Sequence, residues 1–377
     1  MLSDIFLIGN YASDRQESMQ RFARELLRHL SARGISADLL GPQRILNFLP
    51  RTALGKWLGY FDKFVAFPHQ LRRHVATHPG GLYHVLDHSN AVYAKTLGRS
   101  RWLLTCHDLT AIRAAKGEFN SVVSTSATGR RLQAWIEQGL KKASHVVCDS
   151  SATKHDFLRI IGEPASGEPL VIYPGLSPEF SLSADPSPRF QGALLAVGSN
   201  AWNKRRDRIL RIHARVAARR KGVPLCVIGE PLSLELKGLA SKLGTEPLVY
   251  ELGRITDIQL AGLYRVAGAL LFPSEAEGFG WPVAEALACG CPVVATAKGS
   301  LPEVALGELA FLSDGDDEAF AGAALRFLGM SESERMRIQA SSADEVLRRF
   351  SWAAAAGAYI AEYERLCHRQ AGCGFAT

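Results

Sequence analysis

Two glutamates, Glu277 and Glu285, flank a turn in the C-terminal half of the chain. The turn follows an apolar segment that ends at Phe272, and a helical pattern comes after it. Between the glutamates lie two glycines and a proline of the kind that begins helices, Gly278, Gly280 and Pro282. Glycines let the backbone approach a ligand closely, and a helix N-terminus offers free N–H groups and a positive dipole. This combination predicts an anion site, for which a diphosphate is the natural ligand.

The two carboxylates restrict what the anion can belong to. Carboxylates repel phosphates, but they accept strong hydrogen bonds from the hydroxyls of sugars. The pattern therefore indicates a sugar, a diphosphate and a ribose lying along one turn. Composition alone favours a plainer explanation, a strand–turn–helix connection in which one glutamate caps the helix.

Adjacent basic residues follow a second strand and glycine turn. Gly198 and Ser199 end this predicted strand, and Lys204 and Arg205 follow. Basic side chains at the end of a strand suit an anionic ligand such as a diphosphate. A solvated helix face also explains this pair, because further arginines follow at Arg206, Arg208 and Arg211. The position after a strand and Gly198 favours Lys204 as the functional residue.

A histidine, His107, follows a buried strand of the N-terminal half and precedes Asp108. A lone histidine is usually structural, but ligands gather at the carboxyl ends of strands in open α/β sheets. We therefore expect His107 to contact a ligand, and Asp108 either to orient His107 or to cap the next turn.

The elements that position these residues alternate between apolar strands and amphipathic helices. The first series begins with a strand at residues 5–8 and a helix at residues 19–30, and a second series begins near Ala193. Such alternation predicts an α/β protein with parallel sheets. Residues 181–188, rich in Ser, Pro and Asp, have the composition of a linker.

Local patterns predict details of the connections. Ser13 and Gln16 have the spacing of a capping box, and Asp257 has the position of a helix cap. Residues 117–131, which contain several Ser and Thr, have the character of a mobile loop. The Asp-x-Asp at residues 314–316 predicts a solvated turn rather than a metal site.

Composition sets the broad class of the protein. The 377 residues are 47% hydrophobic and 21% charged, which suits two globular domains. A net charge of +7 suits a diphosphate substrate, an anionic membrane surface or simple solubility, and no nucleic-acid-binding module is recognised. Seven cysteines without a CxxC pair favour buried thiols in a reducing compartment. With no leader pattern or bilayer-length apolar run, we expect a cytoplasmic protein, at most peripheral on the inner face of the cell membrane.

Together these motifs resemble the retaining family-4 glycosyltransferases of GT-B fold. The main signature is Glu277-x7-Glu285 set in Glu-Gly-Phe-Gly-x-Pro. Further segments match in the family's order, at residues 105–109, 147–150, 171–175, 197–205, 253–264, 299–303 and 350–352. The resemblance covers nearly the whole chain, and the shared order of the motifs makes it specific.

The resemblance implies two Rossmann-like domains whose parallel sheets face a central cleft. Residues 1–185 would bind the acceptor and residues 186–350 the nucleotide-sugar donor. Residues 351–377 would form a helix that crosses back to the first domain.

The resemblance also implies roles for individual residues. Glu277 would bind the donor sugar and stabilise charge at its anomeric carbon, His107 would contact that sugar, and Lys204 would help the diphosphate leave. Glu285 would hold the ribose. The other donor-binding residues implied are Gly198, Ser199, Arg205, Arg254, Gly278, Phe279, Gly280 and Ser300. The resemblance further implies that no metal and no cofactor are needed, and that a UDP- or GDP-linked sugar is the co-substrate.

The acceptor side departs from the family pattern. A Gly-Gly-x-Gly turn is replaced by Gly9-Asn10-Tyr11, so we expect Asn10 and Arg15, together with Asp87 and His88, to contact the acceptor. Residues 46–75 mix aromatic and basic side chains. This mixture suits contact with an anionic membrane and a lipid-linked acceptor, but it slightly favours a helix packed on the sheet with a solvated basic face.

The expected function is retaining transfer of a mannose- or glucose-type hexosyl unit from a nucleotide diphosphate to a glycan or lipid-linked acceptor, in cell-surface polysaccharide synthesis. One alternative is a sugar-nucleotide epimerase of the same fold, which would need no separate acceptor. The other is a non-catalytic nucleotide-sugar-binding subunit.

Overall fold

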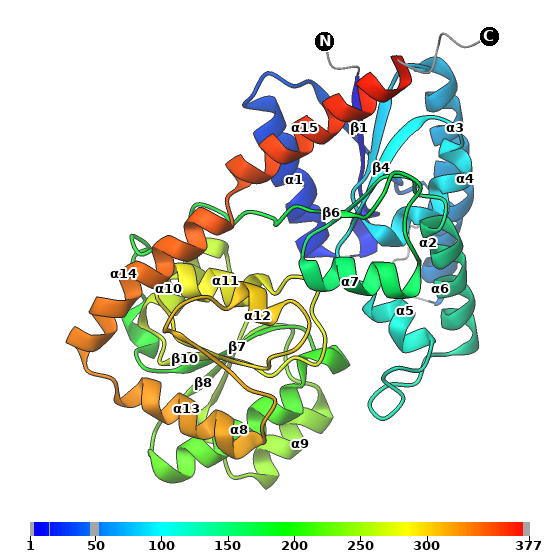
Figure 1. Cartoon of the computed structure of the whole chain (residues 1–377). Helices are drawn as coiled ribbons and strands as arrows, with labels where there is room; N and C mark the ends of the chain where they lie inside the picture. Colours follow the sequence, from blue (N-terminus) through cyan, green and yellow to red (C-terminus); the bar gives the residue numbers. More distant parts are fainter. Residues whose placement is uncertain (1–3, 15, 46–52, 372–377) are drawn as a thin grey trace. The chain divides into compact units, whose positions relative to one another are not determined.

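The chain forms two compact units (Figure 1). The computed structural model describes residues 4–14, 16–45 and 53–371. The first unit comprises residues 1–174 and 352–377, and the second comprises residues 175–351. Each unit is built on one sheet of six parallel strands, so the predicted α/β class is confirmed.

In the first unit the strand order is β2-β1-β3-β4-β5-β6. The strands are β1 (Ile5–Ile8), β2 (Ala37–Leu40), β3 (Leu82–Val85), β4 (Arg101–Cys106), β5 (Val146–Cys148) and β6 (Leu170–Val171). The helices are α1 (Glu17–Ser31), α2 (Ala53–Phe61), the π-helix η2 (Asp62–Ala66), α3 (Phe67–Thr77), α4 (Ala94–Leu97), α5 (Thr110–Ala115), α6 (Ala127–Leu140), α7 (Ser151–Ile160) and α15 (Trp352–Ala371). Short 3-10 turns are η1 (Ala12–Asp14) and η3 (His88–Tyr93).

In the second unit the order is β12-β11-β10-β7-β8-β9. The strands are β7 (Leu194–Gly198), β8 (Leu225–Gly229), β9 (Val249–Gly253), β10 (Ala269–Phe272), β11 (Val293–Ala295) and β12 (Ala310–Leu312). The helices are α8 (Arg206–Arg219), α9 (Leu234–Lys242), α10 (Asp257–Val266), α11 (Trp281–Ala288), α12 (Leu301–Val304), α13 (Asp317–Gly329) and α14 (Glu332–Arg349). The 3-10 turns are η4 (Pro188–Phe190), η5 (Trp202–Lys204) and η6 (Glu246–Leu248).

Both sheets have a switch point at which the strand order reverses. In the first unit β1 lies between β2 and β3, and in the second unit β7 lies between β8 and β10. Connections that leave neighbouring strands in opposite directions at a switch point open a crevice at their carboxyl ends, where α/β proteins bind ligands. The residues that follow β1, β3, β7 and β10 are therefore the ones best placed to form sites.

The alternation of side chains along the strands explains how α15 packs on the first unit. On one sheet face, Phe6, Tyr83 and Leu104 join a hydrophobic core with α3 and α6. On the other face, His84 contacts Tyr363 Oη of α15 through Nδ1 and Thr105 Oγ1 through Nε2, both at 2.7 Å. Burial lowers the pKa of His84 to about 3, so this histidine is a neutral part of the packing.

The second unit has its own core. Helices α8 and α13 pack together against strands β7, β8, β10 and β11, through residues that include Leu210, Val216 and Phe320. The segment 181–188, predicted as a linker, lies within this unit, where the Ser187 N–H donates to the Gly262 carbonyl at 3.0 Å.

Several local predictions are wrong in detail. Helix α1 begins after Gln16 without a side-chain cap, because the Gln16 carboxamide accepts from Asn10 instead. Thr256, rather than Asp257, caps α10 in a capping box with Gln259. The predicted loop at residues 117–131 becomes helical from Ala127, where Ser126 caps α6. The Asp-x-Asp segment, by contrast, is exposed as predicted, and its second aspartate, Asp316, caps α13.

Candidate functional site

The loops that follow β7 and β10 are tied together at the switch point of the second sheet. The Glu275 N–H donates to the Asn203 carbonyl at 2.8 Å, and Asn203 Nδ2 donates to the Ala276 carbonyl at 2.9 Å. These bonds connect segments that lie more than 70 positions apart in the sequence. They place the basic pair of one loop beside the acidic residues of the other.

Lys204 and Glu277 form an ion pair there. Lys204 Nζ lies 2.7 Å from Glu277 Oε1, and the two side chains are 21% and 10% exposed. The ammonium also lies 4.9 Å from the centre of the Phe272 ring, and a Cβ on Gly198 would lie 3.7 Å from the lysine side chain. The structure therefore brings together two of the predicted catalytic residues and holds the lysine in place.

A second acidic residue, Glu275, binds two cations at the same edge. Its carboxylate lies 2.6 Å from Arg205 Nη1 and 2.5 Å from Lys298 Nζ. Burial would raise the pKa of Glu275, but the pairs with Lys298 and Arg205 outweigh burial and lower it. Sequence reasoning missed Glu275 and Lys298, although Glu275 stands only two positions before Glu277. Together with Lys204, these pairs put three cations and two carboxylates at one strand edge.

Arg205 has an unusual backbone. Its φ is 48°, which makes it the one non-glycine residue with a left-handed φ among the described residues. Such a conformation costs about 1 kcal/mol or more and persists where surrounding contacts hold it. Here the guanidinium bonds Asp207, which lies in the first turn of α8, as well as Glu275.

Glycines and a serine shape the turn before α11. Gly299 has φ of 58°, and a Cβ there would lie 2.8 Å from the Glu277 carbonyl oxygen. Ser300 Oγ donates to the Phe279 carbonyl at 2.7 Å. Gly280 is the N-cap of α11 with φ of 94°, and Gly278 lies between Glu277 and Phe279. The turn is thus held from behind by the 299–300 segment, as an anion-binding turn with a fixed backbone requires.

Two further predicted donor residues differ in their surroundings. Glu285 is buried, 3% exposed, and begins the second turn of α11 rather than lying in its first. Arg254 is exposed and follows β9, which β8 separates from β7, so it lies farther along the same sheet edge than Lys204. Ser199 follows β7 directly, and its Oγ accepts from the Ala201 N–H at 3.3 Å.

The interpretation of the basic helix as a solvated face is wrong for Arg206. This side chain is 5% exposed and donates to the carbonyls of Gly198, at 2.7 Å, Ile228, at 3.2 Å, and Glu230, and to Asn200 Oδ1 at 2.7 Å. It therefore clamps the carboxyl ends of β7 and β8, where the loop that carries Lys204 begins.

In the first unit, predicted acceptor residues gather at the switch point between β1 and β3. Asn10 Nδ2 donates to Asp87 Oδ2, and Asn90 Nδ2 donates to Asn10 Oδ1 at 2.8 Å. Burial would raise the pKa of Asp87, but His88, His107 and the bond from Asn10 lower it. His88 Nδ1 lies 3.4 Å from Asp87 Oδ1, and Arg15 lies outside the described residues.

His107 is buried beside this cluster. Its Nδ1 lies 3.0 Å from Asp149 Oδ2 and its Nε2 lies 2.8 Å from the Leu86 carbonyl oxygen. Both partners accept, so both ring nitrogens donate and the ring is an imidazolium. Burial alone would lower the pKa of His107, but Asp149 outweighs it and raises the pKa to about 9. A contact between Nε2 and a sugar would have to replace the bond to Leu86.

His107 should make stability depend on pH. An unfolded histidine has a pKa near ~6.5, so protonated His107 stabilises the fold fully below that pH, and this contribution disappears as pH rises through about 9. We expect the free energy of unfolding to fall by about 2 to 3 kcal/mol between those pH values. Urea denaturation at several pH values should show this fall, and His107→Gln should flatten it. Replacing the exposed His69 by Gln should leave this dependence on pH unchanged. If the free energy of unfolding changes equally with pH in the wild type and in His107→Gln, the protonated state assigned to His107 is wrong.

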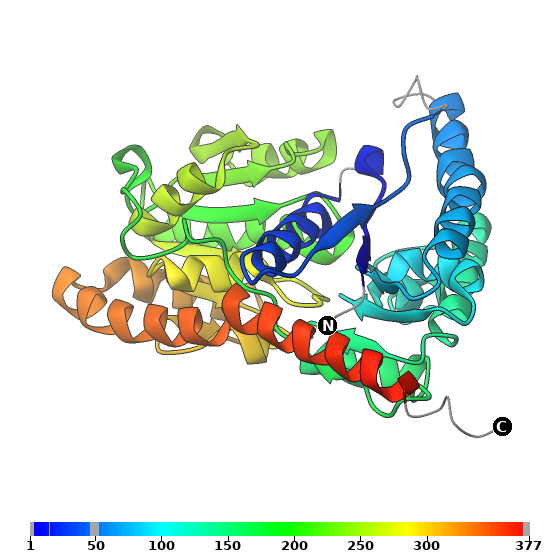
Figure 2. The ribbon, with the colours of Figure 1, turned by 90° about the horizontal axis from the view of Figure 1, so that it is seen from above.

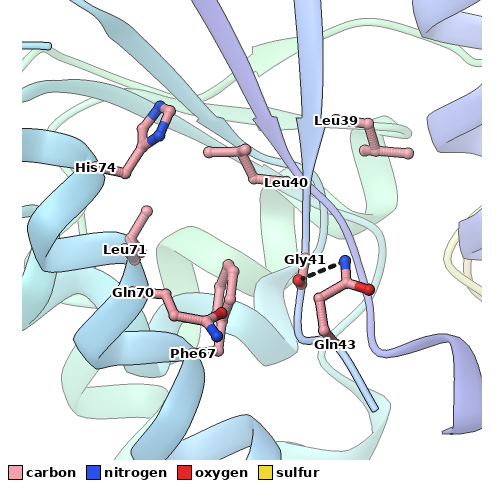
Figure 3. Close-up of a pocket in the computed structure, with 8 residues that line it drawn as sticks. All are labelled: Leu39, Leu40, Gly41, Gln43, Phe67, Gln70, Leu71 and His74. Carbon is pink, nitrogen blue, oxygen red and sulfur yellow. Dashed lines mark hydrogen bonds between the residues drawn. The ribbon is translucent and has the colours of Figure 1, made fainter. Parts of the chain in front are cut away.

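A pocket of about 210 Å³ lies between β2 and α3 in the first unit (Figure 3). Its lining residues are Leu39, Leu40, Gly41, Gln43, Phe67, Gln70, Leu71 and His74. Most of the lining is apolar, and His74 Nε2 is buried without a hydrogen-bond partner in the described part of the chain. Because a Cβ on Gly41 would lie 3.5 Å from the Gly9 carbonyl oxygen, the pocket adjoins the loop that carries Asn10. No sequence pattern pointed to it.

Neither a membrane-spanning helix nor a metal-binding cluster is found among the described residues. No helix there is long and apolar enough to cross a bilayer. No group of three or more His, Cys, Asp or Glu side chains is arranged to hold a metal ion in that part of the chain.

Comparison with known proteins gives matches in both halves of the chain. The family model described as Glycosyltransferase Family 4 matches residues 19–180, and the model described as Glycosyl transferases group 1 matches residues 187–343. D-inositol 3-phosphate glycosyltransferase of Mycolicibacterium smegmatis is 29% identical over 323 residues, covering 80% of this chain and 71% of that protein. MMP alpha-(1->4)-mannosyltransferase of Mycolicibacterium hassiacum is 35% identical over 137 residues, 36% of this chain and 33% of that protein.

Solved structures with the same fold cover almost the full length. Sucrose-phosphate synthase from Thermosynechococcus elongatus has a TM-score of 0.75 at 21% identity, over 97% of this chain and 99% of that one. WaaG, a glycosyltransferase involved in lipopolysaccharide biosynthesis, has a TM-score of 0.67 at 18% identity, and the match covers 94% of this chain and 98% of that one. HepE from Anabaena, in complex with UDP-glucose, has a TM-score of 0.66 at 16% identity, and the match covers 98% of this chain and 99% of that one. Two six-stranded parallel sheets, the ordered motifs and both family models agree, and the chain belongs to the family-4 glycosyltransferases of GT-B fold.

Proposed function

We propose that this glycosyltransferase moves a mannose- or glucose-type hexosyl unit from a UDP- or GDP-linked donor to a glycan or lipid-linked acceptor, with retention of configuration, in cell-surface polysaccharide synthesis. The observation that carries the donor assignment is the Lys204–Glu277 pair beside the turn that precedes α11. The lysine offers positive charge to a diphosphate, and the glutamate offers an acceptor to sugar hydroxyls. HepE binds UDP-glucose, and a matched relative is a mannosyltransferase, which supports both sugar types as candidates.

In the proposed reaction, the bond between the anomeric carbon and the diphosphate oxygen breaks, and the acceptor oxygen attacks the same face of the sugar. Lys204 and Arg205 stabilise the charge that develops on the leaving diphosphate, Glu277 stabilises the positive charge at the anomeric carbon, and the departing phosphate takes the acceptor proton. Because these cations supply the charge, we propose that turnover requires no metal and should continue in EDTA.

On the acceptor side, we propose that Asn10, Asp87 and His88 bind hydroxyls of the acceptor. The adjoining apolar pocket beside Gly41 would take a nonpolar portion of the same molecule, which favours an acceptor that carries an apolar group.

A thermal-shift screen of UDP- and GDP-sugars tests the donor site. A donor at about 100 times its Kd should stabilise the protein by about 2.7 kcal/mol, a rise in Tm of several degrees. Glu285→Ala and Lys204→Ala should abolish the rise, and so should Glu285→Gln, which removes the charge but keeps the size of the side chain. Glu246→Ala, at an exposed position of the same unit, should keep it.

The products then distinguish the alternatives. A retaining transferase releases the nucleotide and forms a new glycoside. NMR should show that this glycoside has the same anomeric configuration as the donor. An isomerised sugar nucleotide without acceptor would indicate an epimerase, and binding without turnover would indicate a subunit. If no nucleotide sugar raises Tm, the donor assignment is wrong.

A further inference from the structure

Helices α2, η2 and α3 run on as one helical rod in the first unit (Figure 2). Three large apolar side chains on this rod are exposed at four-residue intervals: Trp57 is 70% exposed, Phe61 42% and Val65 54%. Trp135 of α6, 43% exposed, joins them, because its ring centre lies 5.1 Å from that of Phe64. We call Trp57, Phe61, Val65 and Trp135 the aromatic stripe.

The opposite side of the rod already accounts for its attachment to the unit. Phe67 and Leu71 are buried in the core, and the buried Asp62 accepts from Tyr11 Oη at 2.9 Å and from the Ile45 N–H at 3.3 Å. The helix-on-sheet interpretation of residues 46–75 therefore holds for this side, although residues 46–52 lie outside the described part. The aromatic stripe is apolar surface that this packing does not use, and such a patch marks an interaction site.

Charge around the stripe is strongly biased. Asp62 is the one acidic residue within residues 57–77, and it is buried. Arg72 and Arg73 continue the exposed side of the rod, and exposed basic residues on and after α6 are Arg130, Arg131, Lys141 and Lys142. The acid in this part of α6, Glu137, is paired with Lys116 at 3.0 Å and Lys141 at 2.9 Å. The surface therefore presents aromatic side chains within a positive border.

We propose that the aromatic stripe and its basic border dock on an anionic lipid bilayer. Tryptophan and phenylalanine enter the region between headgroups and acyl chains, and each Lys or Arg near an anionic surface adds electrostatic attraction. Two copies of this chain pairing through the same face would instead bring like charges together. The proposal concerns the first unit only and does not depend on the donor site in the second.

Vesicle flotation with the full chain tests this docking. The protein should float with vesicles containing 30% phosphatidylglycerol in phosphatidylcholine and remain in solution with pure phosphatidylcholine. Trp57→Ser/Phe61→Ser should lower the partition coefficient at least tenfold. A matched control, Leu234→Ser/Ile258→Ser, removes side chains that are 90% and 69% exposed in the second unit and should bind like the wild type.

Charge reversal tests the border separately. Arg72→Glu/Arg73→Glu should weaken binding at least tenfold, whereas Arg337→Glu/Arg348→Glu, at exposed positions of α14, should not. Each variant must keep the thermal midpoint of the wild type within a few degrees. The proposal is overturned if the wild type does not float, if the Trp57/Phe61 variant floats equally well, or if light scattering shows a dimer that this variant abolishes. Loss of donor binding in any of these proteins would leave the result unaffected.

Discussion

Replacing Lys204 by alanine is expected to lower kcat by about two to three orders of magnitude, with little change in stability. This is the usual effect of removing one preorganised charge or donor that faces the group on which negative charge develops. Lys204 is preorganised because its side chain packs beside Gly198 and the Phe272 ring, while Nζ forms an ion pair with Glu277. The measurement is nucleotide release at saturating acceptor. The donor found in the thermal-shift screen is raised until the rate of each enzyme levels off, because Lys204→Ala should also bind the donor more weakly than the wild type.

Lys237→Ala is the matched control for this variant. Lys237 also pairs with a glutamate of the second unit, Glu251, at 2.8 Å, but its side chain is 50% exposed and lies on α9, away from the turn before α11. We expect its kcat to match that of the wild type. Lys204→Arg should recover part of the activity, because it keeps the charge but changes the geometry. A Lys204→Ala enzyme within threefold of wild-type kcat would show that Lys204 only holds Glu277.

Much of the fold followed from the sequence because the buried strands are short apolar runs. The predicted strand at Ile5–Ile8 matches β1 residue for residue, and the apolar segment predicted to end at Phe272 is β10. Both strands are buried throughout, and residues that interrupt strands flank them, Asp4 and Gly9 in one case and Gly268 and Pro273 in the other. Caps were harder to place. Thr256 and Asp257 are adjacent residues that can both cap a helix, and only the backbone conformation of Thr256 distinguishes them.

The candidate site could be predicted only in part, because its contacts depend on which strands are neighbours. Resemblance to the family pointed to Lys204 and Glu277, but their ion pair follows from the adjacency of β7 and β10. His107 was placed at a strand end, yet its charge state is set by Asp149 and by the Leu86 carbonyl, which no spacing reveals. Asp149 follows β5 and Leu86 follows β3, the strands on either side of β4.

Arg206 is the clearest case of a residue that periodicity misplaces, and its substitution should have the largest effect on stability. In a run of arginines it looks like part of a solvated face, but it begins α8 where the carboxyl ends of β7 and β8 expose their carbonyl groups. Burial lowers the pKa of this guanidinium, and the hydrogen bonds to the protein keep the buried charge satisfied.

Arg206→Met should therefore destabilise the protein by about 3 kcal/mol, because buried carbonyl groups lose charged donors. For a unit of this size that lowers Tm by about 6 to 12 °C. Arg211→Met is the control, since Arg211 lies on the same helix with a 38% exposed side chain and only an ion pair to Asp207, and it should cost at most about 1 kcal/mol. Urea denaturation monitored by tryptophan fluorescence measures both variants.

The same substitution separates support of the loop from direct chemistry. The Gly198 carbonyl that Arg206 holds also accepts from the Glu230 N–H at 3.0 Å, so the end of β7 keeps one anchor when the arginine is removed. At a temperature where Arg206→Met is still folded, we expect donor KM to rise more than kcat falls. The reason is that the loop after β7, which we propose binds the donor phosphates, becomes less ordered while Lys204 remains. If the Arg206 and Arg211 variants are equally stable, the hydrogen bonds from Arg206 to the ends of β7 and β8 contribute nothing to the free energy of unfolding. A fall in kcat as large as that of Lys204→Ala would place Arg206 in the chemistry itself.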